Sequence, residues 1–220
     1  MEESVESAQA IAEPERETES LEQLVSSYNA TENHEVDWDK ELKQLVSSYN
    51  AGSKEASVEG ALAIIYHENK ETGQVEFYLE TKHPNYPRPF EKYQGKKALV
   101  GGVIDPTDKN AHSALIRELN EEIQGKGASI LERIARENPK PIYTVESKDD
   151  DGLLVRNYVF KLEIVKEEDW EIIRNSKMTN DAGYMTILTL EDIKKSNNDD
   201  WAFNHYSMIS RFINENYRAK

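Results

Sequence analysis

The stretch Gly101–Gly125, GGVIDPTDKNAHSALIRELNEEIQG, constrains the fold of this chain more than any other. Its core is the hexapeptide RELNEE at 117–122. At 3.6 residues per turn, Glu118, Glu121 and Glu122 stand at i, i+3 and i+4 and share one helical face. Apolar residues remain on the other side, namely Ala114, Leu115, Leu119 and Ile123. We therefore expect an amphipathic helix that lies on a core.

Three carboxylates within one helical turn repel each other unless a cation lies among them. Hard divalent ions such as Mg²⁺ take carboxylate oxygens and commonly bridge to substrate phosphates. Arg117 precedes Glu121 by four residues, so the two can form an ion pair that holds the acid in place. The alternative interpretation is a solvated acidic helix face, which is the usual meaning of a charge run.

The paired glycines before this helix favour the metal-site interpretation over the solvated acidic face. Gly101-Gly102 follows the apolar run Ala98-Leu99-Val100. Strand, paired glycines, short loop and acidic helix together resemble the Nudix hydrolase box, Gly-x5-Glu-x7-Arg-Glu-U-x-Glu-Glu-x-Gly-U, in which U is a bulky aliphatic residue. The resemblance extends over residues 58–196, and the order of the expected elements agrees with it.

The box departs from the family pattern at two places. Asp108 falls where the family has its first Glu, and the loop 105–110 carries a one-residue insertion before Arg117. Gln124 occupies the family's glycine position, and Gly125 follows one place later. We expect the helix to run one residue longer and to end at Gly125, because glycine is favoured just past a helix end.

The resemblance implies an α/β fold, the Nudix-type α/β/α sandwich with a mixed sheet. It also implies metal-dependent hydrolysis of a diphosphate linkage in a nucleoside diphosphate linked to another moiety. Pro141 and Tyr143, downstream of the box, match markers of ADP-ribose hydrolases and of diadenosine polyphosphate hydrolases respectively. We favour ADP-ribose or a similar nucleotide sugar. The alternatives are a diadenosine polyphosphate or capped-RNA hydrolase, or a non-catalytic Nudix-fold sensor or scaffold.

Site residues are assigned by matching positions in the box. The resemblance implies Mg²⁺ or Mn²⁺ held by the Gly101 carbonyl and by the acids Glu118, Glu121 and Glu122. Glu118 is either a ligand or the group that orients water, and Arg117 holds the glutamates. The catalytic candidates are therefore Glu118, Glu121 and Arg117, and the identity of the general base stays open. Asp181, ahead of the last expected strand, is a further metal candidate, although an aspartate there could simply start a turn.

A second candidate region is the loop 83–97, HPNYPRPFEKYQGKK, which is rich in proline, aromatic residues and cations. Three prolines in six residues exclude a helix or a central strand. Such a loop could stack a base and hold phosphate charge. The candidates for substrate binding are Tyr86, Arg88, Phe90, Tyr93 and Lys97. The alternative is an ordered crossing loop whose aromatic residues only cover the core.

Charge is distributed unevenly along the 220 residues, whose formal net charge is −15. Residues 1–57 hold fourteen Asp and Glu against four Lys and Arg, whereas 58–220 hold 28 against 23. The balance argues against broad nucleic-acid binding, which needs a basic surface, and favours a small nucleotide as the substrate. The chain has no cysteine, no long apolar run and no secretory signal, so we expect a cytoplasmic protein without a membrane span.

We expect two parts, an acidic, partly helical N-terminal extension at 1–57 and a Nudix domain at 58–220. The extension contains a duplicated motif, because LEQLVSSYNA at 21–30 recurs as LKQLVSSYNA at 42–51. Each copy predicts a short amphipathic helix. One interpretation is a linker helix that packs on the domain or frays. The other is a motif for a protein partner or for homodimer formation.

The remaining elements follow from hydrophobic periodicity. Strands are expected at 61–66, 75–80, 98–100, 142–145, 153–165 and 184–188. Helices are expected at 129–138, from Leu190 with Thr189 as its cap, and from Trp201 to Tyr217. The segment 167–175 is either a short helix or an irregular loop. His205 in the last helix is interpreted as a core residue rather than a ligand, and the three aspartates at 149–151 as a hairpin turn.

Overall fold

The computed structural model describes residues 57–86, 91–148, 154–179 and 183–217. The acidic extension with its duplicated motif lies outside these ranges, as do the aspartates at 149–151 and three site candidates, Arg88, Phe90 and Asp181. None of the helices within these ranges has the length and apolar character that a membrane span requires.

Seven strands within the described residues form one mixed sheet. They are β1 (Ser57–Glu68), β2 (Val75–Thr81), β3 (Lys97–Ala98), β4 (Val100–Val103), β5 (Tyr143–Lys148), β6 (Leu154–Glu163) and β7 (Tyr184–Thr189). The main order is β3-β2-β1-β6-β5, with β4 paired to β1 and β7 paired to β2. The long β1–β6 pair is parallel and the other pairs are antiparallel.

The central strand β1 is buried on both faces, which explains the continuous apolar run at 61–66. It continues into β2 through a turn in which the Asn69 side chain accepts hydrogen bonds from the N–H groups of Glu71 and Thr72. Gly73 ends this turn at a φ of 70°, a left-handed conformation that favours glycine. The alternation at 75–80 therefore gives the expected hairpin.

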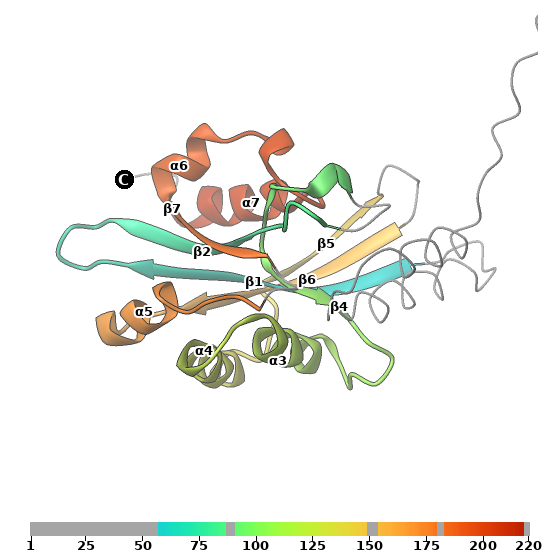
Figure 1. Cartoon of the computed structure of the whole chain (residues 1–220), viewed down its shortest axis with the longest axis horizontal. Helices are drawn as coiled ribbons and strands as arrows, with labels where there is room; N and C mark the ends of the chain where they lie inside the picture. The colour runs from blue at the N-terminus through green and yellow to red at the C-terminus, as the bar shows by residue number, and fades with distance from the viewer. Residues whose placement is uncertain (1–56, 87–90, 149–153, 180–182, 218–220) are drawn as a thin grey trace, which may run out of the picture. The chain divides into compact units, whose positions relative to one another are not determined.

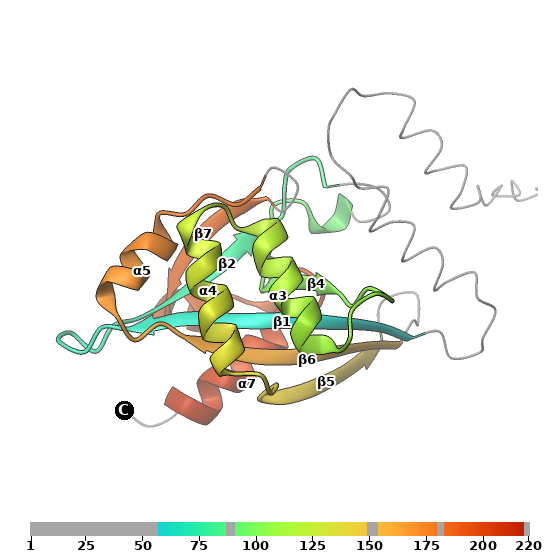
Figure 2. The same cartoon turned by 90° about the horizontal axis from the view of Figure 1, so that it is seen from below.

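Helices cover both faces of the sheet, as Figure 1 shows. They are α3 (Ala111–Glu122), α4 (Lys126–Glu137), α5 (Glu167–Arg174), α6 (Leu190–Lys195) and α7 (His205–Tyr217). Figure 2 shows α3 and α4 side by side across one face, whereas α6 and α7 lie on the other. This arrangement is the α/β/α sandwich that the sequence predicts.

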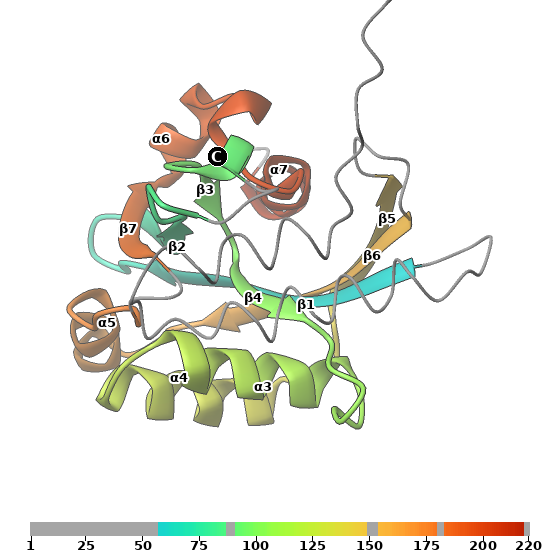
Figure 3. The same ribbon diagram turned by 45° about the vertical axis from the view of Figure 1, so that its right-hand side comes forward.

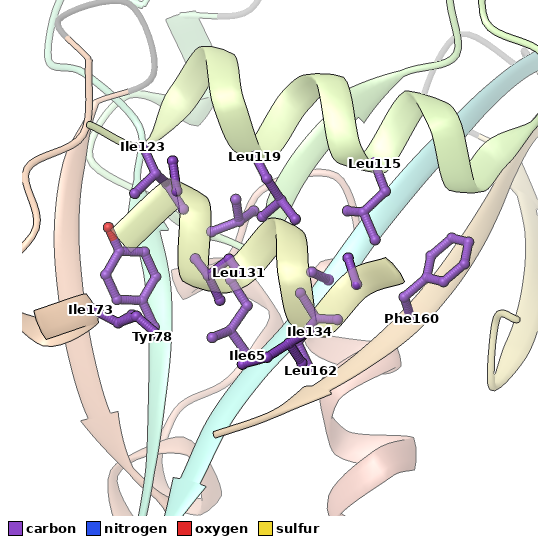
Figure 4. Close-up of a cluster of buried hydrophobic side chains, with 14 of the residues drawn as sticks. Ile65, Tyr78, Leu115, Leu119, Ile123, Leu131, Ile134, Phe160, Leu162 and Ile173 are labelled. Atoms are coloured by element: carbon purple, nitrogen blue, oxygen red, sulfur yellow. The ribbon is translucent and has the colours of Figure 1, made fainter. Parts of the chain in front are cut away.

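Each face has its own hydrophobic core. Below α3 and α4, the helices contribute Leu115, Leu119 and Leu131, which pack against Ile65 and Phe160 of the sheet (Figure 4). The core on the α7 side is built from the alternate residues of the same strands, together with residues of α7; it includes Leu62, Ile64, Phe77, Val159 and Phe212.

The sheet divides where the box begins. β1 and β2 pair directly only between 65–68 and 75–78. Beyond that point β4 pairs with β1 and β3 pairs with β2, so the chain passes from one half of the sheet to the other at Leu99. Figure 3 shows β3 rising away from β4 towards α7. The paired glycines therefore lie at the point where the two halves of the sheet separate.

Two predicted helix boundaries are wrong. The box helix does not reach Gly125, because Ile123 is already extended and forms an isolated β-bridge with Met178. Gly125, at a φ of 71°, instead precedes the start of α4. The last helix begins at His205 rather than Trp201, because Phe203 and Asn204 both have positive φ, at 51° and 61°.

Candidate active site

The two glycines of the box permit two different close approaches. Gly101 has a φ of 126°, and a Cβ there would lie 2.1 Å from the Ala61 carbonyl oxygen. A Cβ on Gly102 would lie 2.8 Å from the carboxyl carbon of Glu118. The Gly101 N–H donates a 3.1 Å hydrogen bond to Oε2 of Glu122. Glu118 and Glu122, which are buried, therefore rest against the glycine pair of β4.

Arg117 gathers most of the other charges of the box. Its guanidinium lies 2.6 Å from Glu118, 2.9 Å from Glu121 and 3.0 Å from Asp108, and it donates a 2.9 Å hydrogen bond to the carbonyl oxygen of Val103. Burial alone would lower the pKa of Arg117, but its hydrogen bonds to Asp108 and Glu118 and the negative charges of Glu118 and Glu121 raise it above the usual value. The arginine therefore stays charged and links β4, the box loop and α3.

The loop before α3 accommodates the inserted residue without moving Asp108 from Arg117. Asp105 accepts hydrogen bonds from the N–H and hydroxyl of Thr107, and its own N–H donates to Asp108. Asn110 then caps α3 through a reciprocal pair of hydrogen bonds with Ser113. The aspartate in the family's first-glutamate position thus meets the arginine across the insertion.

Near Glu122 lies the end of β2, with Tyr78 and Glu80 on one face of the strand and Lys82 directly after its last residue, Thr81. Lys82 Nζ lies 2.7 Å from Oε2 of Glu80, and both side chains are buried. Burial would lower the pKa of Lys82, but the charges of Glu80, Tyr86 and Glu122 raise it well above its usual value. The ammonium group is therefore charged and lies within electrostatic reach of a box carboxylate.

The chemistry of the box suits a hard divalent cation. Its carboxylates come from Glu118, Glu121 and Glu122, next to a glycine carbonyl, and oxygen donors of this kind are those that Mg²⁺ and Mn²⁺ prefer. Across the described ranges, no group of three or more His, Asp or Glu side chains is gathered closely enough to hold a metal ion. Arg117 instead pairs with Glu118 and Glu121. In kind, these oxygen donors fit such a cation.

Of the substrate candidates that the structure describes, one is buried and two are half-buried. Tyr86 is buried, its ring lies edge-on to Phe203 at 6.4 Å, and Lys82 Nζ lies 5.1 Å from its centroid. The ring of Tyr93 lies 4.1 Å from that of Phe203. Lys97 belongs to β3, opposite Thr81. Tyr86 and Tyr93 are thus brought together around Phe203, and the proposed roles of all three in substrate binding stay predictions.

His205 is buried, which confirms its interpretation as a core residue. Its Nδ1 accepts a 3.0 Å hydrogen bond from the N–H of Leu99, at the crossing between the two halves of the sheet. Burial, reinforced by the positive charge of Lys82, lowers the pKa of His205 to about 3. The imidazole is therefore neutral and serves as an acceptor.

Glu80 and Lys82 lie beside the box although no motif in the sequence marks them. Their spacing of two residues places them on the same face of β2 as Tyr78. A strand that carries two opposite charges on the face shared with a core tyrosine is a signal for a buried ion pair. The signal is weak, because the sequence alone does not show which face of the strand is covered.

Known proteins were compared with this chain by sequence and by structure, and only the structures match. No protein-family model matches the chain, and no curated protein sequence matches it. Among solved structures, a MutT protein from Methanosarcina mazei Go1 matches with a TM-score of 0.52 at 19% identity, over 76% of this chain and 99% of that one. A MutT/nudix family protein from Enterococcus faecalis matches with a TM-score of 0.52 at 18% identity, over 90% of this chain and 70% of that one.

A third match is a bifunctional NMN adenylyltransferase/ADP ribose pyrophosphatase from Francisella tularensis, with a TM-score of 0.54 at 16% identity. It extends over 80% of this chain but only 47% of that protein. The sandwich and the box helix thus form a mixed α/β domain, and this domain is similar in structure to the MutT proteins. The chain has the Nudix fold.

Proposed function

We propose that the chain is a metal-dependent Nudix pyrophosphohydrolase, which cleaves a diphosphate linkage in a nucleoside diphosphate linked to another moiety. The observation that carries this proposal is the arrangement around Arg117, in which Glu118, Glu121 and Asp108 converge beside the paired glycines. A solvated acidic face would leave all of these side chains in water. Glu121 is exposed, but Glu118 and Glu122 are buried against β4. The cost of burying their charges is offset by the ion pair of Glu118 with Arg117 and by the hydrogen bond from the N–H of Gly101 to Glu122.

In this proposal Glu118, Glu121 and Glu122 hold Mg²⁺ or Mn²⁺ together with the Gly101 carbonyl, and Asp181 is a further ligand. The cation would neutralise phosphate charge and make a water molecule acidic enough to attack phosphorus. Arg117 keeps the carboxylates ordered and limits their mutual repulsion before the cation enters. Positioning and charge neutralisation carry most of the catalysis in phosphoryl transfer.

The substrate class that we favour is ADP-ribose or a similar nucleotide sugar. One fold neighbour, the Francisella protein, is an ADP ribose pyrophosphatase in one of its two activities. The marker for the diadenosine polyphosphate alternative, Tyr143, is largely buried, and its hydroxyl donates a hydrogen bond to the Met208 carbonyl oxygen of α7. The packing of α7 against β5 thus gives that tyrosine a structural role of its own.

A panel of nucleotides tests the proposal. The purified chain is incubated with Mg²⁺ or Mn²⁺ and with ADP-ribose, other nucleotide sugars, diadenosine polyphosphates, nucleoside triphosphates and capped RNA, and the products are separated by chromatography. Glu121→Gln removes a box carboxylate, and Glu137→Gln, on the exposed end of α4, is the matched charge control. We expect one compound class to be cleaved by the parent chain and by the control but not by Glu121→Gln. Ligand binding without cleavage anywhere would favour the non-catalytic sensor.

A further inference from the structure

The hydroxyl of Tyr78 is a buried polar group without a hydrogen-bond partner among the residues that the structure describes. The side chain is 0% exposed. More than about 90% of buried polar groups in proteins have a partner, and a buried tyrosine hydroxyl usually finds one. Tyr78 lies in the middle of β2, in the core below α3, so its hydroxyl has no access to bulk water.

The direction of the side chain relates this hydroxyl to the box. Figure 4 shows the ring of Tyr78 with its oxygen directed towards the end of α3 at Ile123, the residue next to Glu122. Burial, and then the charges of Glu122 and Glu80, raise the pKa of Tyr78, so the phenol remains protonated and is a donor. Glu122 and Glu80 are the two carboxylates whose charge reaches this hydroxyl.

Of the two acids, Glu122 is the better acceptor for this hydroxyl. The charge of Glu122 raises the pKa of Tyr78 more than the charge of Glu80 does, and Glu80 is held through Oε2 by the buried ammonium of Lys82 at 2.7 Å. Glu122 is held by the N–H of Gly101 through Oε2, and a carboxylate has lone pairs for about four hydrogen bonds. A carboxylate that β4 already holds through one oxygen can therefore accept a further hydrogen bond from β2.

We propose that Tyr78 is a positioning residue of the metal site. Its hydroxyl donates a hydrogen bond to Glu122, directly or through one water molecule, when a divalent cation is bound, and this sets the orientation in which the carboxylate meets the cation. The inference rests on the proposed function only in taking Glu122 as a metal ligand. It explains why a core position on β2 carries a tyrosine rather than a phenylalanine of the same shape.

The test is Tyr78→Phe in the full chain, with Tyr143→Phe as the matched control. Both changes remove one hydroxyl from a buried ring, but the hydroxyl of Tyr143 already bonds to α7, in the core on the face of the sheet opposite α3. Three quantities are measured for each protein: the thermal unfolding midpoint without metal, Mn²⁺ affinity by calorimetry, and the dependence of hydrolysis on Mn²⁺ concentration.

For Tyr78→Phe we expect an unfolding midpoint equal to or above that of the parent chain, because the lost hydroxyl has no partner in the metal-free protein. Mn²⁺ affinity should fall about tenfold to a hundredfold, the usual effect of removing a hydrogen bond to a metal ligand. The loss in hydrolysis should appear in kcat, with a higher Mn²⁺ midpoint and little change in KM. Tyr143→Phe should show the opposite pattern, with a lower unfolding midpoint and unchanged Mn²⁺ affinity.

Two results would overturn the inference. Unchanged Mn²⁺ affinity in Tyr78→Phe would show that the hydroxyl does not act through Glu122, whether or not hydrolysis is detected. A clear fall in the metal-free unfolding midpoint would assign it a structural hydrogen bond instead. Mn²⁺ binding that weakens in Tyr78→Phe, in a chain that cleaves no nucleotide, would keep the inference and refute the proposed function.

Discussion

Gly102→Ala tests whether the position of Glu118 depends on a missing side chain. The new methyl group would lie 2.8 Å from the carboxyl carbon of Glu118, whereas ordinary contacts begin at 3.4 Å. The carboxylate would therefore have to move by about 0.6 Å, the difference between these two distances. Glu118 is the flexible end of a side chain, so it can move without disturbing the backbone of α3.

That displacement is small for stability but large for a metal ligand. Ligand distances in a metal site are held within about 0.2 Å, and a misplacement of about 1 Å can cost about a hundredfold in rate. We expect Gly102→Ala to lower kcat/KM about tenfold to a hundredfold. Its free energy of unfolding should change by no more than about 1 kcal/mol, because the loss of glycine's freedom in the unfolded chain offsets the local crowding.

The neighbouring glycine provides the contrast. Gly101→Ala places a methyl group 2.1 Å from a backbone oxygen of β1, at a φ of 126°. We expect it to lose about 3 kcal/mol or more of stability, since neither the strained backbone nor the strand can yield easily. Steady-state hydrolysis and urea unfolding measured on both variants separate the two effects. A Gly102→Ala protein with the parent kcat/KM would refute the role assigned to Glu118.

Two further predictions follow from the charges. Asp108→Asn leaves Arg117 with a weaker partner in a half-buried network, so the free energy of unfolding should fall by about 1 to 3 kcal/mol in urea denaturation; an unchanged value would show that the loop does not depend on this pair. The pKa of His205 is about 3 in the folded protein and 6.5 ordinarily. Below about pH 6.5 the imidazole therefore binds a proton in the unfolded chain but not in the folded one, so the free energy of unfolding falls as the pH drops. The slope should reach about 1.4 kcal/mol per pH unit near pH 5, and His205→Asn, which keeps an acceptor for Leu99, should remove that contribution. Equal slopes in both proteins between pH 5 and 6.5 would contradict the burial of a neutral imidazole.

The sequence predicted most of the architecture because its local signals agree with the tertiary structure. The apolar run of β1, the turn at Asn69, the Thr189 cap and the box helix are each specified by nearby residues. Within the box, the i, i+4 spacing predicted the ion pair between Arg117 and Glu121. The segment 167–175, which sequence left undecided, is the helix α5 because Trp170 and Ile173 bury one face.

The errors arise where distant segments decide the local structure. Ile123 leaves the helix because Met178, more than fifty residues away, pairs with it as a β-bridge. The start of α7 is delayed by the left-handed backbone at Phe203, whose ring packs between Tyr86 and Tyr93 of the proline-rich loop. No periodicity in the sequence reports such contacts.

Contacts between distant segments also explain why the sequence did not predict Glu80 and Lys82 beside the site. Glu80 and Lys82 look like ordinary charged residues at the end of an alternating strand, which would face water. They are buried because the sheet divides between β3 and β4 and encloses the end of β2. The path of the chain through Leu99 creates this interior, and hydrophobic patterning alone does not predict it.

The most direct test of the account follows the oxygen atom of water. The substrate identified in the nucleotide panel is hydrolysed with Mn²⁺ in ¹⁸O-labelled water by the parent chain, by Glu122→Gln and by the exposed control Glu137→Gln, and the products are weighed by mass spectrometry. We expect one ¹⁸O on a product phosphate with the parent and the control. Glu122→Gln, which keeps an acceptor for Gly101 but loses a charge, should give almost no product. Labelled product formed equally fast by Glu122→Gln, or product without ¹⁸O on phosphate, would contradict hydrolysis of a diphosphate at this site.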